Sequence, residues 1–196
     1  MMENDSQPRV GSGWLALVVA LFLLGLTAVF SLNRSTSATT VVGTLNGEPF
    51  TREAFENELR FSDLRATLAN QVPQPVNKVA LLNRMVGDAL ILQVAHNAGV
   101  NTLDSEVDSE LTAIVSQFGL SEAEMRQQLA DHGLTWDDFR RSVGNYMTII
   151  TFLEEGLLAS VPPEQQQVFM QNWMGELLSN ASIDFDEAFI MEISTQ

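Results

Sequence analysis

The chain has 196 residues, and its 25 acidic and 10 basic side chains give a formal net charge of −15 at pH 7. Such an acidic chain repels phosphate backbones, so composition argues against nucleic acid as a partner. It contains no cysteine, which excludes disulfide bonds, thiolate metal sites and cysteine nucleophiles. The length suffices for one ordinary domain with an appendage.

The N-terminal part is divided by its composition. Residues 1–13 are polar and predicted to be a disordered tail. Residues 14–32 carry no charge, and as a helix they would cover about 28 Å, close to the apolar thickness of a bilayer. We expect a transmembrane anchor there; the alternative is a secretory signal peptide cut near Thr36. Residues 33–40 read as a linker.

The expected anchor sets the expected location. A short tail before a hydrophobic segment is typical of a signal-anchor. The basic residues that flank the segment are nearly balanced, so charge does not set its orientation. We therefore predict a single-pass protein of the cell membrane whose C-terminal domain is extracytoplasmic, either periplasmic or at the cell surface.

A hairpin opens the folded part. Asn46-Gly47 lies between two short extended runs, which favours a type I′ turn over residues 41–50. Pro49 confines the second strand to a sheet edge. Thr51 then provides an N-cap for the next helix.

Helices fill the middle of the chain. Apolar periodicity and caps predict four of them: one that begins after Thr51 and ends before the proline-containing break at residues 71–75, and three over residues 76–98, 104–118 and 121–132. The start of the third is assigned to either Thr102 or Asp104 as the cap. The fourth begins with a capping box in which Ser121 pairs with Glu124.

The same capping device then opens a long helix. Thr135 is its cap and Asp138 the returning acid, and apolar spacing continues the helix from Trp136 to about Ser160. Pro162-Pro163 stops it, because proline cannot continue a helix interior.

The C-terminal part is expected to bring the chain back to its start. A last helix is predicted over residues 164–180, followed by a short strand at 183–185. A lone hairpin is marginally stable, so this strand is expected to pair with residues 41–45. Residues 187–193 fit either strand or helix, and residues 186–196 are assigned to a C-terminal tail. The fold class is therefore mainly α, with a small sheet formed by the two ends of the domain.

Several segments share caps and apolar positions with one protein family. The opening VGTLNGEPFTREAF and the helix LNRMVGDALILQVAHNAGV look like the opening and the central helix of the SurA-type and PpiD-type extracytoplasmic foldases. The matching segments, in the family's order, are residues 42–55, 82–100, 104–108, 120–129, 133–140 and 173–183. The resemblance covers about residues 41–185 and implies a SurA N-terminal-like, trigger-factor-like helical chaperone domain.

The chain departs from that family at one place. Many members carry a parvulin-type prolyl isomerase domain between the long helix and the returning helix. Here only about residues 161–168 lie between them, far too few for a domain. The resemblance therefore implies the chaperone module without isomerase activity, and no catalytic residue is carried over.

The residues offer little for catalysis or cofactor binding. His96 and His132 lie near the ends of predicted helices, where a cation complements the helix dipole, and metal or proton-transfer roles are the minor alternative. No catalytic residue, metal site, cofactor or small-molecule substrate is predicted, and the chain is not expected to be an enzyme.

Apolar surface is the remaining candidate for function. Flexible methionines and a wide apolar arc on the long helix suit the binding of varied polypeptides. The candidate residues are Met85, Met125, Met147, Ile149 and Phe152, and the alternative is that they simply belong to the core. We expect a membrane-anchored, chaperone-like module that binds non-native polypeptides without catalysis. The alternative is an assembly subunit that holds one fixed polypeptide of a membrane complex.

Overall fold

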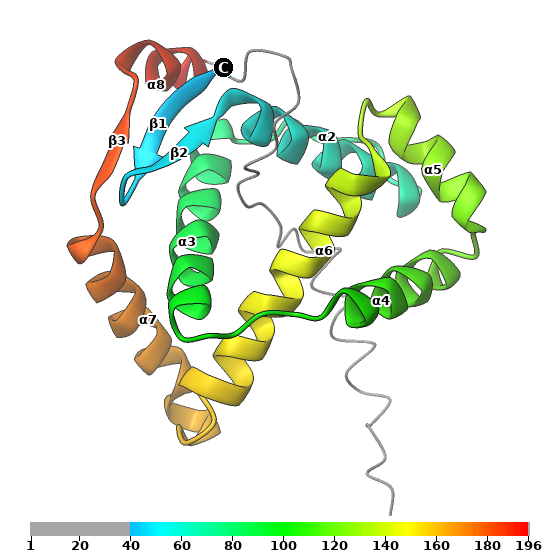
Figure 1. Cartoon of the computed structure of the whole chain (residues 1–196). Helices are drawn as coiled ribbons and strands as arrows, with labels where there is room; N and C mark the ends of the chain where they lie inside the picture. Colours follow the sequence, from blue (N-terminus) through cyan, green and yellow to red (C-terminus); the bar gives the residue numbers. More distant parts are fainter. Residues whose placement is uncertain (1–39, 196) are drawn as a thin grey trace, which may run out of the picture.

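The computed structural model describes residues 40–195 as a mainly helical fold with a small sheet at one corner (Figure 1). The strands are β1 (Val41–Leu45), β2 (Glu48–Thr51) and β3 (Ile183–Phe185). The helices are α2 (Arg52–Leu68), α3 (Lys78–Asn97), α4 (Asp104–Gln117), α5 (Glu122–Asp131), α6 (Trp136–Thr151), the π-helical segment η1 (Phe152–Leu157), α7 (Pro163–Asn180) and α8 (Glu187–Ser194).

The predicted return of the chain is confirmed. The sheet is antiparallel with strand order β2-β1-β3, and Gly43 pairs with both Phe50 and Phe185. A Cβ atom on Gly43 would lie 2.3 Å from Phe185 Cδ1, so only glycine fits this pairing. The two ends of the described chain therefore meet in one sheet, as the marginal stability of a lone hairpin requires.

Local signals place the helix starts as expected at three positions. The hydroxyl groups of Thr51, Ser121 and Thr135 accept hydrogen bonds from the backbone N–H groups of Ala54, Glu124 and Asp138. The start of α4 differs from the prediction. Leu103 is the N-cap, and its N–H donates to Glu106 Oε2 at 2.8 Å.

Thr102 and Asp104, the two predicted caps, instead form hydrogen bonds with α6. The hydroxyl group of Thr102 lies 2.9 Å from that of Thr148 on α6. Asp104 accepts from Arg140, also on α6, at 3.1 Å. Both predicted caps are thus used to join α4 to α6.

Two differences concern the C-terminal elements. The long helix beginning at Trp136 changes to π-helical geometry at Phe152 and ends at Leu157. The expected tail 186–196 is corrected, because it contains α8, whose Phe189 and Ile193 are each 2% exposed. These two side chains are one helical turn apart, so a helix buries both against the sheet.

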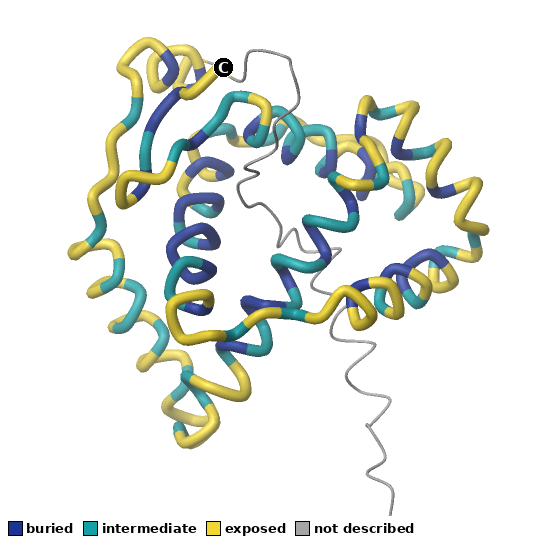
Figure 2. The backbone as a smooth tube through the Cα atoms, viewed as in Figure 1, coloured by how far each residue is buried: buried dark blue, intermediate teal, exposed yellow. Residues whose placement is uncertain are grey.

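The core forms three apolar clusters, and α2, α3 and α6 run between them (Figure 2). We call the first region the helical lobe: the C-terminal half of α2, α4, α5 and the N-terminal part of α6. We call the second the sheet lobe: the three strands, α8, and the N-terminal parts of α2 and α3. The third cluster joins the C-terminal part of α3 to α6, η1 and α7.

No helix within residues 40–195 is long and apolar enough to cross a membrane. Crossing a bilayer takes about 20 mostly apolar residues, and even the 20-residue α3 contains Lys78, Arg84 and Asp88. On this finding we correct the predicted location, a single-pass cell-membrane protein with an extracytoplasmic domain. The expected tail 1–13, anchor 14–32 and linker up to residue 39 lie outside the described residues.

Candidate polypeptide-binding surface

The five apolar residues predicted to bind polypeptides lie in different parts of the core. Met85 belongs to the sheet lobe and Met125 to the helical lobe, and they are 2% and 0% exposed. Ile149 and Phe152 are buried in the third cluster, whereas Met147 is half-buried against the helical lobe. The fold does not bring them together on one surface. Their contact with a polypeptide stays a prediction, and in the folded chain it requires the core to open.

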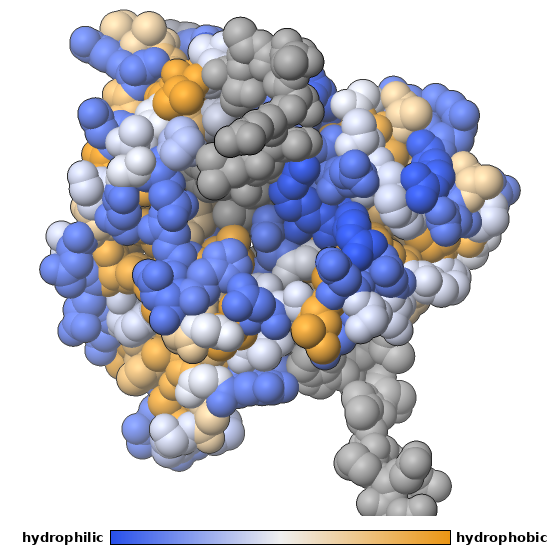
Figure 3. Space-filling view, viewed as in Figure 1, coloured by the Kyte–Doolittle hydropathy of each residue, from blue (hydrophilic) through white to orange (hydrophobic). Residues whose placement is uncertain are grey.

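A different apolar surface lies along α7. This 18-residue helix has no buried residue, and Figure 2 shows it half-buried or exposed throughout. Val168 and Leu178 are 59% and 40% exposed. We call the apolar side chains of this helix the α7 surface: Val168, Phe169, Met170, Trp173, Met174, Leu177 and Leu178. Figure 3 shows hydrophobic side chains along this edge of the molecule.

The inner side of α7 is held only partly. Trp173, Met174 and Leu177 are half-buried and pack against the third cluster, with the Trp173 ring centroid 6.1 Å from that of Phe152. Only Glu164 and Glu176 carry charge on the helix, and the other polar residues are neutral. The α7 surface can therefore accept apolar side chains with little cost from desolvating charges.

A buried group of charged side chains lies between α2 and α3. Glu58 Oε1 accepts hydrogen bonds from Arg65 Nη2 at 3.0 Å and from Arg84 Nη2 at 2.7 Å. Glu58 is 1% exposed, and Asp88 lies one helical turn after Arg84 and is 6% exposed. Burial raises the pKa of Asp88 to about 7, the Arg84 charge opposes the shift, and the Glu58 charge adds to it.

A second pair of buried polar groups lies near α6. Burial raises the pKa of Glu110, and it raises the pKa of Tyr146 to about 12, with smaller contributions from the charges of Glu154 and Glu110. Glu110 Oε1 and the Tyr146 hydroxyl are buried without a hydrogen-bond partner among the described residues. Burial thus disfavours the charged form of both groups.

The two histidines lie where the sequence placed them, near helix ends. His132 Nδ1 is 2.8 Å from the Gln128 carbonyl oxygen, and its Nε2 is 3.3 Å from the Thr67 hydroxyl, so the ring joins α5 to α2. His96 is exposed in the last turn of α3. Within residues 40–195, no group of three or more histidine or acidic side chains is placed to hold a metal ion.

The α7 surface and the buried charged group were missed by the sequence analysis, although the sequence contains a signal for each. In the helix predicted over residues 164–180, the apolar positions Val168, Met170, Met174 and Leu178 lie beside the face formed by Phe169, Trp173 and Leu177, so the helix is apolar over more than the face it packs with. Glu58 and Asp88 fall at buried helical positions, three residues after Phe55 and three after Met85. A charged residue in an apolar stripe predicts a buried partner, here Arg65 and Arg84.

Comparison with known proteins identifies the domain. A family model described as the SurA N-terminal domain matches residues 51–152, which is just over half of the chain. The chain is also similar to the Chaperone SurA of Cupriavidus metallidurans, with 27% identity over 135 residues, covering 67% of this chain and 27% of that protein.

Other relatives carry the same name. The Chaperone SurA of Pectobacterium atrosepticum is 30% identical over 69 residues, covering 35% of this chain and 16% of that protein. That of Cupriavidus pinatubonensis is 24% identical over 123 residues, or 62% and 25% of the two chains. The match thus spans less than a third of the length of each relative. Only residues 158–162 separate η1 from α7, so no further domain is inserted there. On its fold and on the matched segment, the chain belongs to the SurA N-terminal domain family.

Proposed function

We propose that the chain is a chaperone-like module that binds non-native polypeptides through the α7 surface, without catalysis. The observation that carries the proposal is an 18-residue helix with no buried residue and several exposed apolar side chains. Exposed apolar side chains gathered on one weakly packed helix suit an interaction with an apolar partner. The relatives that share the matched segment are named chaperones, which supports a polypeptide as the ligand.

The chemistry of the surface fits an unfolded client. Methionine side chains adapt to partners of different shape, and Met170 and Met174 both lie on the α7 surface. Glutamine and asparagine residues flank the apolar positions and are able to bond the backbone of an extended chain. The weak burial of α7 also leaves it free to shift as clients differ.

Aggregation of an unfolded model client tests the proposal. The full chain is expected to suppress light scattering by the client, and the Val168→Ser/Leu178→Ser double variant to suppress it much less. Met191→Ser is the matched control, since Met191 is 56% exposed on α8, outside the α7 surface. Circular dichroism checks that all three proteins fold. Equal suppression by the double variant and the control would remove the α7 surface from the proposal.

Purification under mild conditions separates this function from the alternative, an assembly subunit with one fixed partner. A heterogeneous set of crosslinked polypeptides supports the chaperone-like function. A single stoichiometric partner would support the subunit instead.

A further inference from the structure

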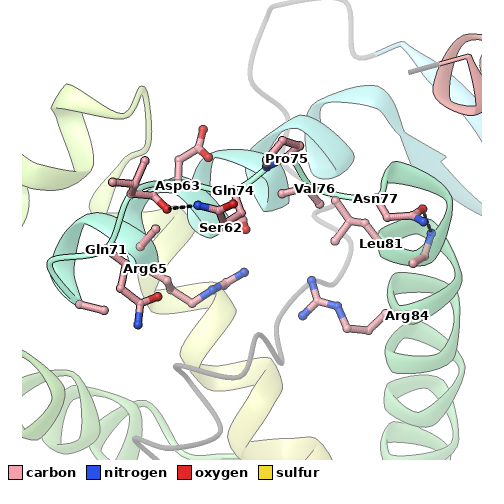
Figure 4. Close-up of a pocket in the computed structure, with 14 residues that line it drawn as sticks. Ser62, Asp63, Arg65, Gln71, Gln74, Pro75, Val76, Asn77, Leu81 and Arg84 are labelled. Carbon is pink, nitrogen blue, oxygen red and sulfur yellow. Dashed lines mark hydrogen bonds between the residues drawn. The ribbon is translucent and has the colours of Figure 1, made fainter.

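A cavity of about 560 Å³ lies between the C-terminal half of α2, the connection over residues 69–77 and the start of α3. Arg65 from α2 and Arg84 from α3 point toward each other across it (Figure 4). Val76 and Leu81 form an apolar part of its wall. The cavity thus places two guanidinium groups beside apolar side chains, away from the α7 surface.

The two arginines share one carboxylate. Both donate to the same oxygen of Glu58, Oε1. Burial raises the pKa of Asp88, one helical turn after Arg84, to about 7, so the four side chains together carry less than one net positive charge at pH 7. Asp63 also lines the cavity, but it is exposed and its carboxylate points away from the two guanidinium groups (Figure 4). In a chain with a net charge of −15, this small cationic site is unusual.

One donor at the site is unused. Arg84 Nη1 is buried and has no hydrogen-bond partner among residues 40–195. A buried N–H group without an acceptor is costly, and more so on a charged group. Of the three amides that line the cavity, Gln74 donates to the Val72 carbonyl oxygen at 3.1 Å and Asn77 accepts from the Ala80 N–H at 2.9 Å, and the third is Gln71. The Arg84 side chain is 28% exposed and lines the cavity, so a small turn of its guanidinium group is needed to present Nη1 to a ligand.

We propose that this cavity binds a carboxylate group of a polypeptide, with Arg84 donating to its oxygens and Val76 and Leu81 contacting the apolar part of the same residue. Guanidinium groups bind carboxylates with strong, charge-assisted hydrogen bonds. The site has at most one excess positive charge, which suits a single carboxylate, whereas a phosphate dianion would leave surplus negative charge in an acidic chain. The inference rests on the proposed polypeptide binding and adds a specificity to it.

Three labelled peptides with the same apolar sequence test the proposal by fluorescence anisotropy with the full chain. The first ends in a free carboxylate, the second is amidated, and the third is amidated but contains one glutamate. The wild type is expected to bind at least one acidic peptide about tenfold or more tightly than the neutral amide. The first and third peptides distinguish a C-terminal carboxylate from an acidic side chain.

Variants at the cavity make the test specific. Arg84→Gln is expected to abolish the preference for acidic peptides, while Arg65 still pairs with Glu58. Ala80→Leu fills part of the cavity from an exposed helical position and leaves the charged side chains unchanged. It should also lower the affinity for the acidic peptides. Arg126→Gln is the control, because Arg126 pairs with Glu122 on α5 away from the cavity.

The outcomes separate this inference from the proposed function. Equal affinity of the wild type for acidic and neutral peptides would overturn the carboxylate site, as would an acidic preference retained in both Arg84→Gln and Ala80→Leu. Suppression of client aggregation depends on the α7 surface and is expected to survive Arg84→Gln. A carboxylate preference without any suppression would therefore contradict the proposed function alone.

Discussion

The helical lobe and the sheet lobe differ in how far apart in sequence their contacts lie. In the helical lobe, α4, α5 and α6 follow one another with short connections, and each adds apolar residues to one cluster. In the sheet lobe, β1 and α2 meet β3 and α8 from the other end of the chain. Arg52 on α2 forms two hydrogen bonds of 2.9 Å with Glu192 on α8, across 140 residues of sequence.

This difference has consequences for stability. Contacts that are local in sequence cost less chain entropy to form than contacts between distant segments. The helical lobe can therefore organise from nearby residues, whereas the sheet lobe is complete only when the C-terminal residues return. Glu58 lies between the two on α2, since Phe55 packs in the sheet lobe and Phe61 in the helical lobe.

Phe189→Ala is expected to cause the largest loss of stability in the sheet lobe. Phe189 is 2% exposed and packs edge-on against Phe55, with ring centroids 5.3 Å apart. Removing a buried aromatic side chain costs about 3–5 kcal/mol, measurable as a lower free energy of unfolding in urea. Met191→Ala, at an exposed position of the same helix, should change it by about 0.5 kcal/mol or less.

Hydrogen exchange of Phe189→Ala compares the stability of the two lobes. Phe189→Ala is expected to lower the protection of amides in β1 and β3 more than that of amides in α5. Uniform loss across both lobes would mean that they unfold as one unit. No difference between Phe189→Ala and Met191→Ala would contradict the placement of α8 in the core.

Asp88→Asn tests the charged group between the lobes through pH. The pKa of Asp88 is raised to about 7 in the folded chain from its ordinary value of 3.8, so the folded state binds more protons than the unfolded state between these pH values. The protonated Asp88 therefore stabilises the folded state at low pH. This contribution to the free energy of unfolding falls as pH rises from about 4 to 7 and is absent above that range.

Asparagine has no proton to lose in this range. The stability advantage of Asp88→Asn over the wild type should therefore grow by about 2–4 kcal/mol between pH 5 and pH 8, as urea unfolding at both pH values would measure. Glu110 also has a raised pKa, but it is common to both proteins and drops out of the difference. An advantage that is the same at both pH values would mean that Asp88 titrates normally.

The sequence predicts local features better than contacts between distant residues, and the pairing of β3 with β1 is the exception, because the marginal stability of a lone hairpin indicates it. The caps at Ser121 and Thr135 act within three residues, so the pattern alone identifies them. The start of α4 is misassigned because Thr102 bonds to Thr148, 46 residues away, instead of capping. Contacts of this kind leave no local pattern.

The C-terminal segment and the candidate site show the same limit. Residues 187–193 are too short for periodicity to decide between strand and helix, and only packing against the sheet does so. Residue type and helical spacing suggested Met85, Met125 and Ile149 as binding residues. They do not distinguish a core face from an exposed one, and the fold buries all three. The α7 surface is recognised only once neighbouring helices show how little of it they cover.

The smallest expected effect concerns the duplicated cap in the helical lobe. Thr135→Ala and Ser121→Ala each remove a hydroxyl that accepts a backbone N–H at a helix start, at a cost of about 1 kcal/mol. Thr135→Ser keeps the hydroxyl group and should stay within a few tenths of a kcal/mol of the wild type.

The two caps should differ in how far their loss spreads. α6 contributes six buried residues and runs between clusters, whereas α5 contributes only Met125 and Leu129. Thr135→Ala is therefore expected to lower the free energy of unfolding of the whole domain. Ser121→Ala should mainly speed hydrogen exchange in the first turn of α5. If Ser121→Ala lowered global stability as much as Thr135→Ala does, α5 and α6 would unfold as one cooperative unit, and α5 would not be the less stable part of the lobe.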